Sequence, residues 1–78
     1  MSKRVVTPFG ERLNRARLEA GLSVRDLSVL TGMQFSCIYQ YENYGRTPTI
    51  DRAADLAKVL GKSLDWLCGM DKNEGSNQ

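Results

Sequence analysis

The sequence predicts an all-α domain built from five short helices. Apolar residues recur at three- and four-residue intervals along most of the chain, and no stretch alternates in the manner of a strand. Hydroxyl side chains precede four of the predicted helices, where they can accept hydrogen bonds from the first free amides. With 78 residues, 41% of them hydrophobic, the chain can bury one modest core. We therefore expect one compact domain at residues 8–70.

The first helix is expected from about Pro8 to Ala20, with Thr7 as its cap. Proline suits the first helical position because it leaves no amide unpaired there. The apolar stripe of this helix consists of Phe9, Leu13, Ala16 and Ala20. Residues 1–7, which include Lys3 and Arg4, are expected to form a flexible N-terminal arm.

The segment from Ser23 to Tyr44 predicts two short amphipathic helices joined by a tight turn at Gly32, which is a helix-turn-helix. Ser23 should cap helix two, and Asp26 three residues later completes a capping box. In helix three, the helical angle places Ile38, Tyr41 and Glu42 on the inner face. The opposite face carries Ser36, Gln40 and Asn43.

The polar face of helix three suits a DNA groove. Hydroxyl and amide groups both donate and accept hydrogen bonds, as base edges in the major groove require, whereas a solvated helix more often carries Glu and Lys. An unspecialised polar surface is the alternative interpretation, and this face alone does not decide between the two.

Glu42 needs a cation, because an unpaired carboxylate on the buried face would be strongly destabilising. Arg17 borders the apolar stripe of helix one and can supply that charge. We predict an ion pair between Arg17 and Glu42 that orients helix three on helix one and adds little net stability, since desolvation offsets much of the attraction.

Helices four and five complete the predicted fold. Helix four begins after Pro48 with Thr49 as its cap, ends at Gly61, and is expected to bury Ile50, Ala53, Ala54, Ala57 and Leu60. Ser63 caps a fifth helix from Leu64 to about Cys68. Residues 71–78 are polar and lack aromatic residues, so we expect a disordered tail.

An ordered set of short motifs extends over about Phe9 to Gly69. It comprises Ala16-Arg17, Gly21-Leu22-Ser23, Leu27-Ser28, Gly32-Met33-Gln34, Ile38 with Glu42, Gly45-Arg46 with Pro48-Thr49, Leu56-Ala57, Leu60-Gly61 and Ser63-Leu64-Asp65-Trp66-Leu67. On these motifs the chain resembles the Cro/C1-type helix-turn-helix proteins of lambdoid phages and their bacterial relatives. The resemblance implies a five-helix, lambda repressor-like fold with the helix-turn-helix at helices two and three. It also implies a sequence-specific regulator of transcription, a repressor of phage or mobile-element type that binds a palindromic double-stranded DNA operator.

Three positions depart from the family pattern. Val24 stands where many members have a phosphate-binding Gln. Tyr44 stands where the loop glycine usually is, and Gly45 comes one residue later. Phe35 stands where the family often has a base-reading polar residue. Its ring is expected either to meet a thymine methyl group or to fold back as packing.

The expected DNA contacts fall into two groups. The residues expected to read bases are Gln34, Phe35, Ser36, Tyr39 and Gln40. The residues expected to contact the DNA backbone are Arg25, Asn43, Tyr44, Arg46 and Thr47, together with free amides at the start of helix two. The Tyr39 hydroxyl can equally bind phosphate, and a solvated loop charge is the alternative for Arg46.

A symmetric homodimer is the species expected on DNA, because one short helix reads too few base pairs. Its interface is expected at Leu64, Trp66, Leu67 and Met70, since this short helix carries more apolar surface than it can bury alone. For Trp66, a core position covering helices one and four is an equal alternative.

Composition argues against most other classes. The chain has no histidine, no glycine-rich phosphate loop and no clustered carboxylates, so we expect no enzyme, cofactor, metal site or small-molecule substrate. Cys37 and Cys68 lack metal-type spacing and are expected to be buried or half-buried thiols. No apolar run suits a membrane span or a signal peptide, which makes a cytoplasmic location the expectation.

The charge distribution favours the half that contains the motif. Residues 1–48 carry a net charge of +3 and residues 49–78 a net charge of −1. The rival interpretation is a protein-interaction adaptor that keeps this fold without reading DNA. Val24 and the aromatic residues Phe35 and Tyr39 are the best evidence for that rival.

Overall fold

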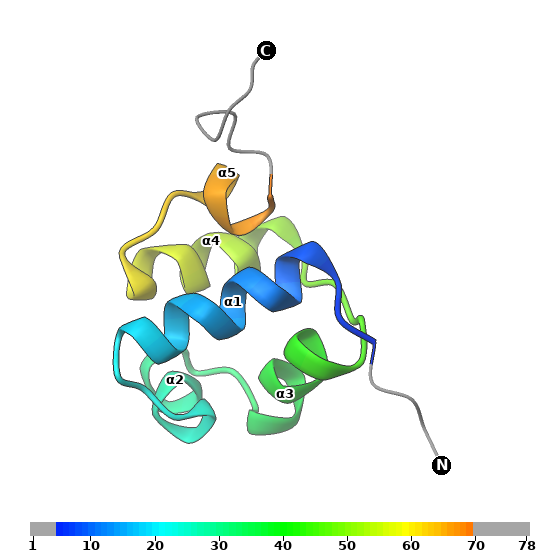
Figure 1. Cartoon of the computed structure of the whole chain (residues 1–78). Helices are drawn as coiled ribbons and strands as arrows, with labels where there is room; N and C mark the ends of the chain where they lie inside the picture. Colours follow the sequence, from blue (N-terminus) through cyan, green and yellow to red (C-terminus); the bar gives the residue numbers. More distant parts are fainter. Residues whose placement is uncertain (1–4, 70–78) are drawn as a thin grey trace.

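Five helices make up the part of the chain that the computed structural model describes, residues 5–69 (Figure 1). They are α1 (Pro8–Glu19), α2 (Val24–Thr31), α3 (Phe35–Asn43), α4 (Ile50–Leu60) and α5 (Leu64–Leu67). In Figure 1, α1 crosses the middle of the molecule, with α2 and α3 below it and α4 and α5 above it. α1 packs against α3 and α5, and α2 packs against α3 and α4. The predicted all-α fold is confirmed.

Four of these helices begin at the hydroxyl side chains that the sequence predicts as caps. Thr7 accepts a hydrogen bond from the Gly10 amide at 3.0 Å, and Ser23 forms a complete capping box with Asp26. Thr49 and Ser63 cap α4 and α5 in the same way. α3 differs, because Gln34 at its N-cap makes no side-chain capping hydrogen bond. The cap side chains satisfy free amides and so fix where the other four helices start.

One apolar cluster forms the core. Its buried members are Phe9, Leu13, Ala16, Leu27, Met33, Cys37, Ile38, Tyr41, Ala53, Leu56, Ala57, Leu60 and Leu67. Every helix contributes to this set, so no pair of helices has a separate core. Within residues 5–69, no helix has the length and apolar character needed to cross a membrane.

Three predicted core positions are wrong, two of them at helix ends. Ala20 is exposed because α1 ends at Glu19 and the chain turns away at its cap. Ile50 is 72% exposed because it is the first residue of α4, at the edge of the core. Ala54 is only half-buried, and Leu56, which the predicted stripe omitted, is fully buried instead.

The backbones of α1 and α3 approach closely at Gly10. A Cβ atom built on this residue would lie 2.3 Å from the carbonyl oxygen of Tyr41, so only glycine fits without a shift. Beside this contact, the rings of Phe9 and Tyr41 meet edge to face, with their centroids 6.1 Å apart. The close approach places α3 directly against α1 and leaves its other side outward.

The segment before α1 lies against the end of α3. The Val5 amide donates to the Asn43 carbonyl at 2.7 Å, and Val5 forms an isolated parallel bridge with Tyr44. Gly45 follows with φ +75°, and a Cβ atom there would lie 2.9 Å from Val5 Cγ1. Residues 5–7, assigned above to a flexible arm, are thus tied to the domain. Lys3, Arg4, Met70 and the expected tail at 71–78 lie outside the described residues.

Candidate nucleic-acid interface

The helix-turn-helix is formed by α2 and α3, which pack against each other below α1 (Figure 1). α2 ends at Gly32, whose backbone is left-handed with φ 74°, and the chain enters α3 two residues later. Met33 in the turn and Leu27 on α2 are both buried, which fixes the angle at which α3 leaves the turn.

The inner face of α3 is the one that the helical angle predicts. Ile38, Tyr41 and Glu42 are 0%, 1% and 2% exposed. On the outer face Ser36 is exposed, while Gln40 and Asn43 are half-buried. α3 therefore presents only uncharged polar and aromatic side chains outward, because its single carboxylate is buried.

The predicted ion pair between Arg17 and Glu42 is present. Arg17 Nε lies 2.8 Å from Glu42 Oε2, and Arg17 Nη2 lies 3.0 Å from Oε1, so the contact is bidentate. Arg17 Nη1 also donates to the Leu22 carbonyl at 2.8 Å, and Asn14 Nδ2 donates to Glu42 Oε1 at 2.9 Å. The pair joins α1, the α1–α2 turn and α3. Asn14 was not predicted, although it lies three residues before Arg17 on the same helix face.

The pair also favours the charged form of the buried guanidinium. Its hydrogen bond to Glu42 raises the pKa of Arg17, and the opposite charge of Glu42 adds to this, whereas burial lowers it. Arg17 is only 8% exposed, so the carboxylate is what compensates its charge.

The five expected base-reading residues share the outer surface at α3, and we call this set the reading face: Gln34, Phe35, Ser36, Tyr39 and Gln40. Gln34, Phe35, Ser36 and Tyr39 are exposed, and Gln40 is half-buried. Because the Gln34 side chain makes no capping hydrogen bond, it is available to a ligand.

Aromatic rings form a row along this surface. Phe35 and Tyr39 stack nearly parallel with centroids 6.2 Å apart, and Tyr39 lies 5.9 Å from Tyr44. All three residues are between 43% and 49% exposed. Phe35 therefore does not fold back into the core.

Arg46, in the loop after α3, is anchored onto that helix. Its Nη1 lies 2.9 Å from Gln40 Oε1 and 3.3 Å from Cys37 Sγ. The guanidinium also lies over the Tyr41 ring, 5.8 Å from its centroid. Arg46 is nevertheless exposed, so its guanidinium is both held on α3 and open to solvent. The contact with Gln40 was not predicted, because it depends on how the chain turns back at Gly45.

The other residues expected to contact the DNA backbone lie on α2, at the end of α3 and in the loop that follows it. Arg25 near the start of α2, Tyr44 and Thr47 are exposed. Asn43 Nδ2 donates to the Tyr39 carbonyl at 3.0 Å, so this amide is already engaged within α3.

The start of α2 has fewer free amides than we expected. The Asp26 amide donates to Ser23 Oγ at 3.0 Å, and Asp26 Oδ2 accepts from the Ser23 amide at 2.9 Å. These hydrogen bonds hold the pKa of Asp26 below its ordinary value, with the Ser23 backbone contact as the main cause. The ionised carboxylate stands where a phosphate would approach, so Arg25 is the stronger candidate for a phosphate contact at this end.

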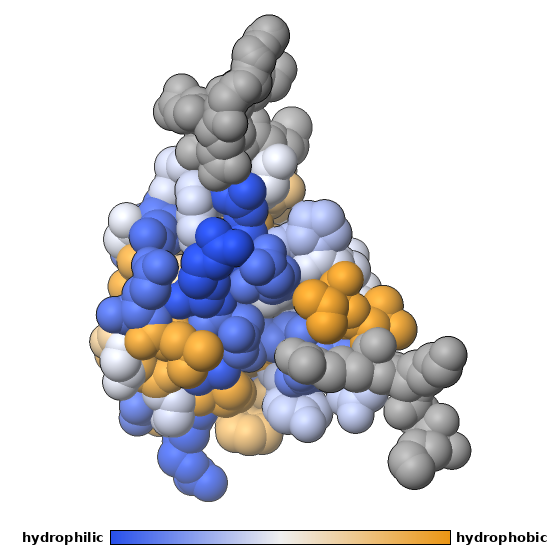
Figure 2. All heavy atoms as spheres, viewed as in Figure 1, coloured by the Kyte–Doolittle hydropathy of each residue, from blue (hydrophilic) through white to orange (hydrophobic). Residues whose placement is uncertain are grey.

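Some of the other positive groups on the described surface are paired with carboxylates, whereas Arg52 and Lys58 on α4 have no carboxylate partner within residues 5–69. Figure 2 shows mainly hydrophilic residues over the front of α1. Arg15 binds Glu11 at 2.8 Å within α1, and Glu19 of α1 binds Lys62, which follows α4, at 3.2 Å. Arg25 on α2 and Arg46 also have no carboxylate partner within residues 5–69, and Arg46 lies against the reading face at Gln40.

The expected dimer interface is partly wrong. Leu67 is fully buried inside the chain, because α5 closes the core between α1 and α4, and it has no surface to give a partner. Leu64 and Trp66 are half-buried. Trp66 lies between two cations, with the Arg12 guanidinium 5.0 Å and Lys62 Nζ 4.8 Å from its ring. The Trp66 side chain packs against the core, in agreement with the alternative interpretation of this residue as part of the core and not of an interface.

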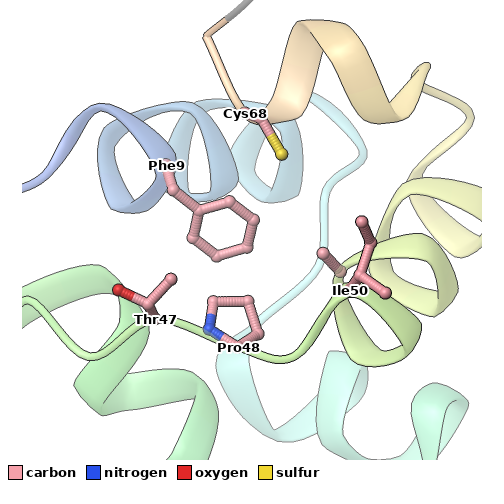
Figure 3. A pocket seen from close by; sticks show the side chains of 6 residues that line it. Phe9, Thr47, Pro48, Ile50 and Cys68 are labelled. Carbon is pink, nitrogen blue, oxygen red and sulfur yellow. The ribbon is translucent and has the colours of Figure 1, made fainter.

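One apolar pocket of about 270 Å³ lies away from any cluster of charged groups. It is lined by Phe9 of α1, Thr47 and Pro48 of the loop, Ile50 and Ala53 of α4, and Cys68 (Figure 3). In Figure 3 the Thr47 oxygen lies on the side away from Ile50. The lining offers no acid, base or charged group for chemistry. Cys37 is buried and Cys68 exposed, so the expectation for Cys68 is wrong, and no metal-binding cluster occurs in the described part of the chain.

Comparison with known proteins agrees with this arrangement. The pattern of a helix-turn-helix family matches residues 13–67. A helix-turn-helix-type transcriptional regulatory protein of Aeropyrum pernix is 32% identical over 59 residues, which are 76% of this chain but only 18% of that protein.

Two solved structures share the fold. The restriction-modification controller protein C.AhdI from Aeromonas hydrophila superposes with a TM-score of 0.72 at 30% identity, over 77% of this chain and 91% of that chain. The biofilm master regulator SinR, solved in complex with DNA, gives a TM-score of 0.72 at 27% identity, over 76% of this chain and 95% of that chain. These relatives are regulators and not enzymes, in agreement with the expectation for this protein. The chain belongs to the helix-turn-helix family of the Cro/C1 type.

Proposed function

We propose that this protein is a sequence-specific regulator of transcription that binds double-stranded DNA and reads the major groove with the reading face of α3. The observation that carries the proposal is the division of α3 into two faces. Its inner face and its only carboxylate are buried, while its outer face offers hydroxyl, amide and aromatic groups. Such groups match the donors, acceptors and methyl groups of base edges.

Two exposed arginines support the same function. Arg25 on α2 and Arg46 in the loop after α3 lack carboxylate partners within residues 5–69, so their charges are open to a polyanion. The names of the relatives also support it, since the Aeropyrum protein is named as a transcriptional regulatory protein and SinR was solved in complex with DNA.

The finer proposal is a repressor of phage or mobile-element type that binds a palindromic operator as a symmetric dimer. Isologous pairing would place two α3 helices about one helical turn, roughly 34 Å, apart. Since Leu67 is buried, the interface would use the exposed edges of Leu64 and Trp66. Sedimentation equilibrium with and without operator tests this: two chains per duplex support the dimer, and one chain at saturation contradicts it.

Selection of bound sequences from random duplex DNA with the purified full chain tests the function. We expect enrichment of one consensus, whereas no enrichment would favour an adaptor that uses the aromatic row for a protein partner. Ser36→Glu should abolish enrichment because it places a carboxylate on the reading face. Lys58→Gln on the exposed side of α4 lowers the net charge by the same amount and should leave the consensus unchanged.

A further inference from the structure

The contact between Arg46 and Gln40 joins an expected backbone residue to an expected base reader. Arg46 Nη1 lies 2.9 Å from Gln40 Oε1, and the Arg46 amide also donates to the Gln40 carbonyl at 3.3 Å. The same Nη1 lies 3.3 Å from Cys37 Sγ, and the guanidinium rests over the Tyr41 ring. Contacts with three residues of α3 thus hold the guanidinium in place.

The chemistry of the two groups fixes the orientation of the Gln40 amide. A guanidinium has only donors, so the atom that faces it must be the carboxamide oxygen. The amide nitrogen then points away from Arg46, and it has no partner within residues 5–69. Gln40 therefore offers two N–H donors to an approaching ligand, and its oxygen has only one lone pair left, beside the guanidinium.

We propose that Arg46 sets the base preference of Gln40 by occupying its oxygen. This inference rests on the DNA-binding function proposed above. A glutamine with both groups free binds adenine well, because its oxygen accepts from N6 while its nitrogen donates to N7. With the oxygen engaged by the guanidinium, acceptance from adenine N6 is weakened, and the two N–H donors of Gln40 suit N7 and O6 of guanine or O4 of thymine better.

The loop geometry makes this arrangement part of the fold. Gly45 has φ +75° and lies against Val5, which is itself bonded to the end of α3. This turn brings Arg46 back along α3 to reach the Gln40 side chain. Arg46 is thus a positioning residue for readout, and it differs from a phosphate contact, whose loss weakens all sequences alike.

The test repeats the selection from random duplex DNA with four further proteins: Gln40→Ala, Arg46→Ala, the double variant, and Arg25→Ala as the control that also removes one exposed arginine. The position whose preference relaxes in Gln40→Ala is the one that Gln40 reads. In the wild type we expect guanine or thymine there, favoured over adenine by about fivefold or more. In Arg46→Ala the freed oxygen should move this preference to adenine, and in the double variant the position should show none.

The control separates base positioning from general electrostatics. Arg25→Ala should weaken binding to every sequence and leave the preference at this position unchanged. Adenine or cytosine at this position in the wild type would overturn the inference, as would an unchanged preference in Arg46→Ala or an unchanged consensus in Gln40→Ala. Those results would leave DNA binding intact, whereas a wild-type protein that enriches no sequence would refute the proposed function itself.

Discussion

Replacing Glu42 with glutamine should destabilise the fold strongly, because it removes the charge that compensates a buried arginine. Glu42 accepts two hydrogen bonds from Arg17 and one from Asn14, and it is 2% exposed. Glutamine keeps the shape and one oxygen but carries no charge. Arg17 is itself only 8% exposed, so its guanidinium would remain buried beside a neutral group.

The size of the effect follows from that burial. Breaking a buried ion pair by removing one partner costs about 3–5 kcal/mol, and the remaining oxygen of glutamine favours the lower end. A chain of this length has a total stability of about 4–12 kcal/mol, so the loss is a large fraction of the whole. Urea unfolding followed by circular dichroism measures it. With a slope of about 1 kcal/mol per M, the midpoint should fall by about 3 M.

Glu11→Gln is the matched control. It removes the Arg15–Glu11 pair, which has the same 2.8 Å separation but lies on the exposed side of α1. Exposed pairs of this spacing contribute about 0.3–0.5 kcal/mol, so this variant should unfold almost as the wild type does. Equal losses in the two variants would refute the argument from burial. A double variant, Arg17→Met with Glu42→Leu, should recover most of the stability, because no buried charge is then left alone.

Three further variants test other parts of the fold. Gly10→Ala would normally favour a helix, but its Cβ would lie 2.3 Å from the Tyr41 carbonyl oxygen, so we expect a loss of about 1–3 kcal/mol; an unchanged or raised Tm would contradict this. Because the pKa of Asp26 is lowered in the folded state, its carboxylate stabilises the fold at pH values above its unfolded pKa, and this stability is lost as the pH falls through the folded pKa. Asp26→Asn should therefore lose less stability on acidification than the wild type does. Identical Tm profiles of the two proteins across the acid range would contradict this prediction. Leu67→Ala should cost about 2–5 kcal/mol at every protein concentration, because Leu67 belongs to the chain's own core; a loss that depends on concentration would instead place it in an interface.

Local features of the sequence were sufficient to predict the helices. The caps at Thr7, Ser23, Thr49 and Ser63 act within three residues, so sequence spacing alone locates them. The burial of Glu42 followed from helical periodicity, and its need for a cation followed from the cost of burying a charge. The first inference needs only the helical angle of α3, and the second needs only the fact that Glu42 is buried.

The errors arose where packing between distant segments decides. Ile50 fits the apolar period of α4, yet the core does not extend to the first turn of that helix, and Leu56 is buried instead. Leu67 was assigned to a partner because a short apolar helix looked unable to bury its residues, but α1 and α4 cover it. The contact between Arg46 and Gln40 depends on the left-handed turn at Gly45, whose direction no periodicity reveals.

The location of the DNA contact can be measured directly by titrating the 15N-labelled protein with the duplex recovered by selection and following backbone and side-chain amide shifts by NMR. We predict the largest changes at Ser36 and at the Gln34 and Gln40 side-chain amides, with smaller changes at Arg25 and Arg46. Lys58 and Val59, on the exposed side of α4, should not shift. Shifts centred on α4 and α5, with the signals of α3 unchanged, would contradict the assignment of α3 as the DNA-reading helix.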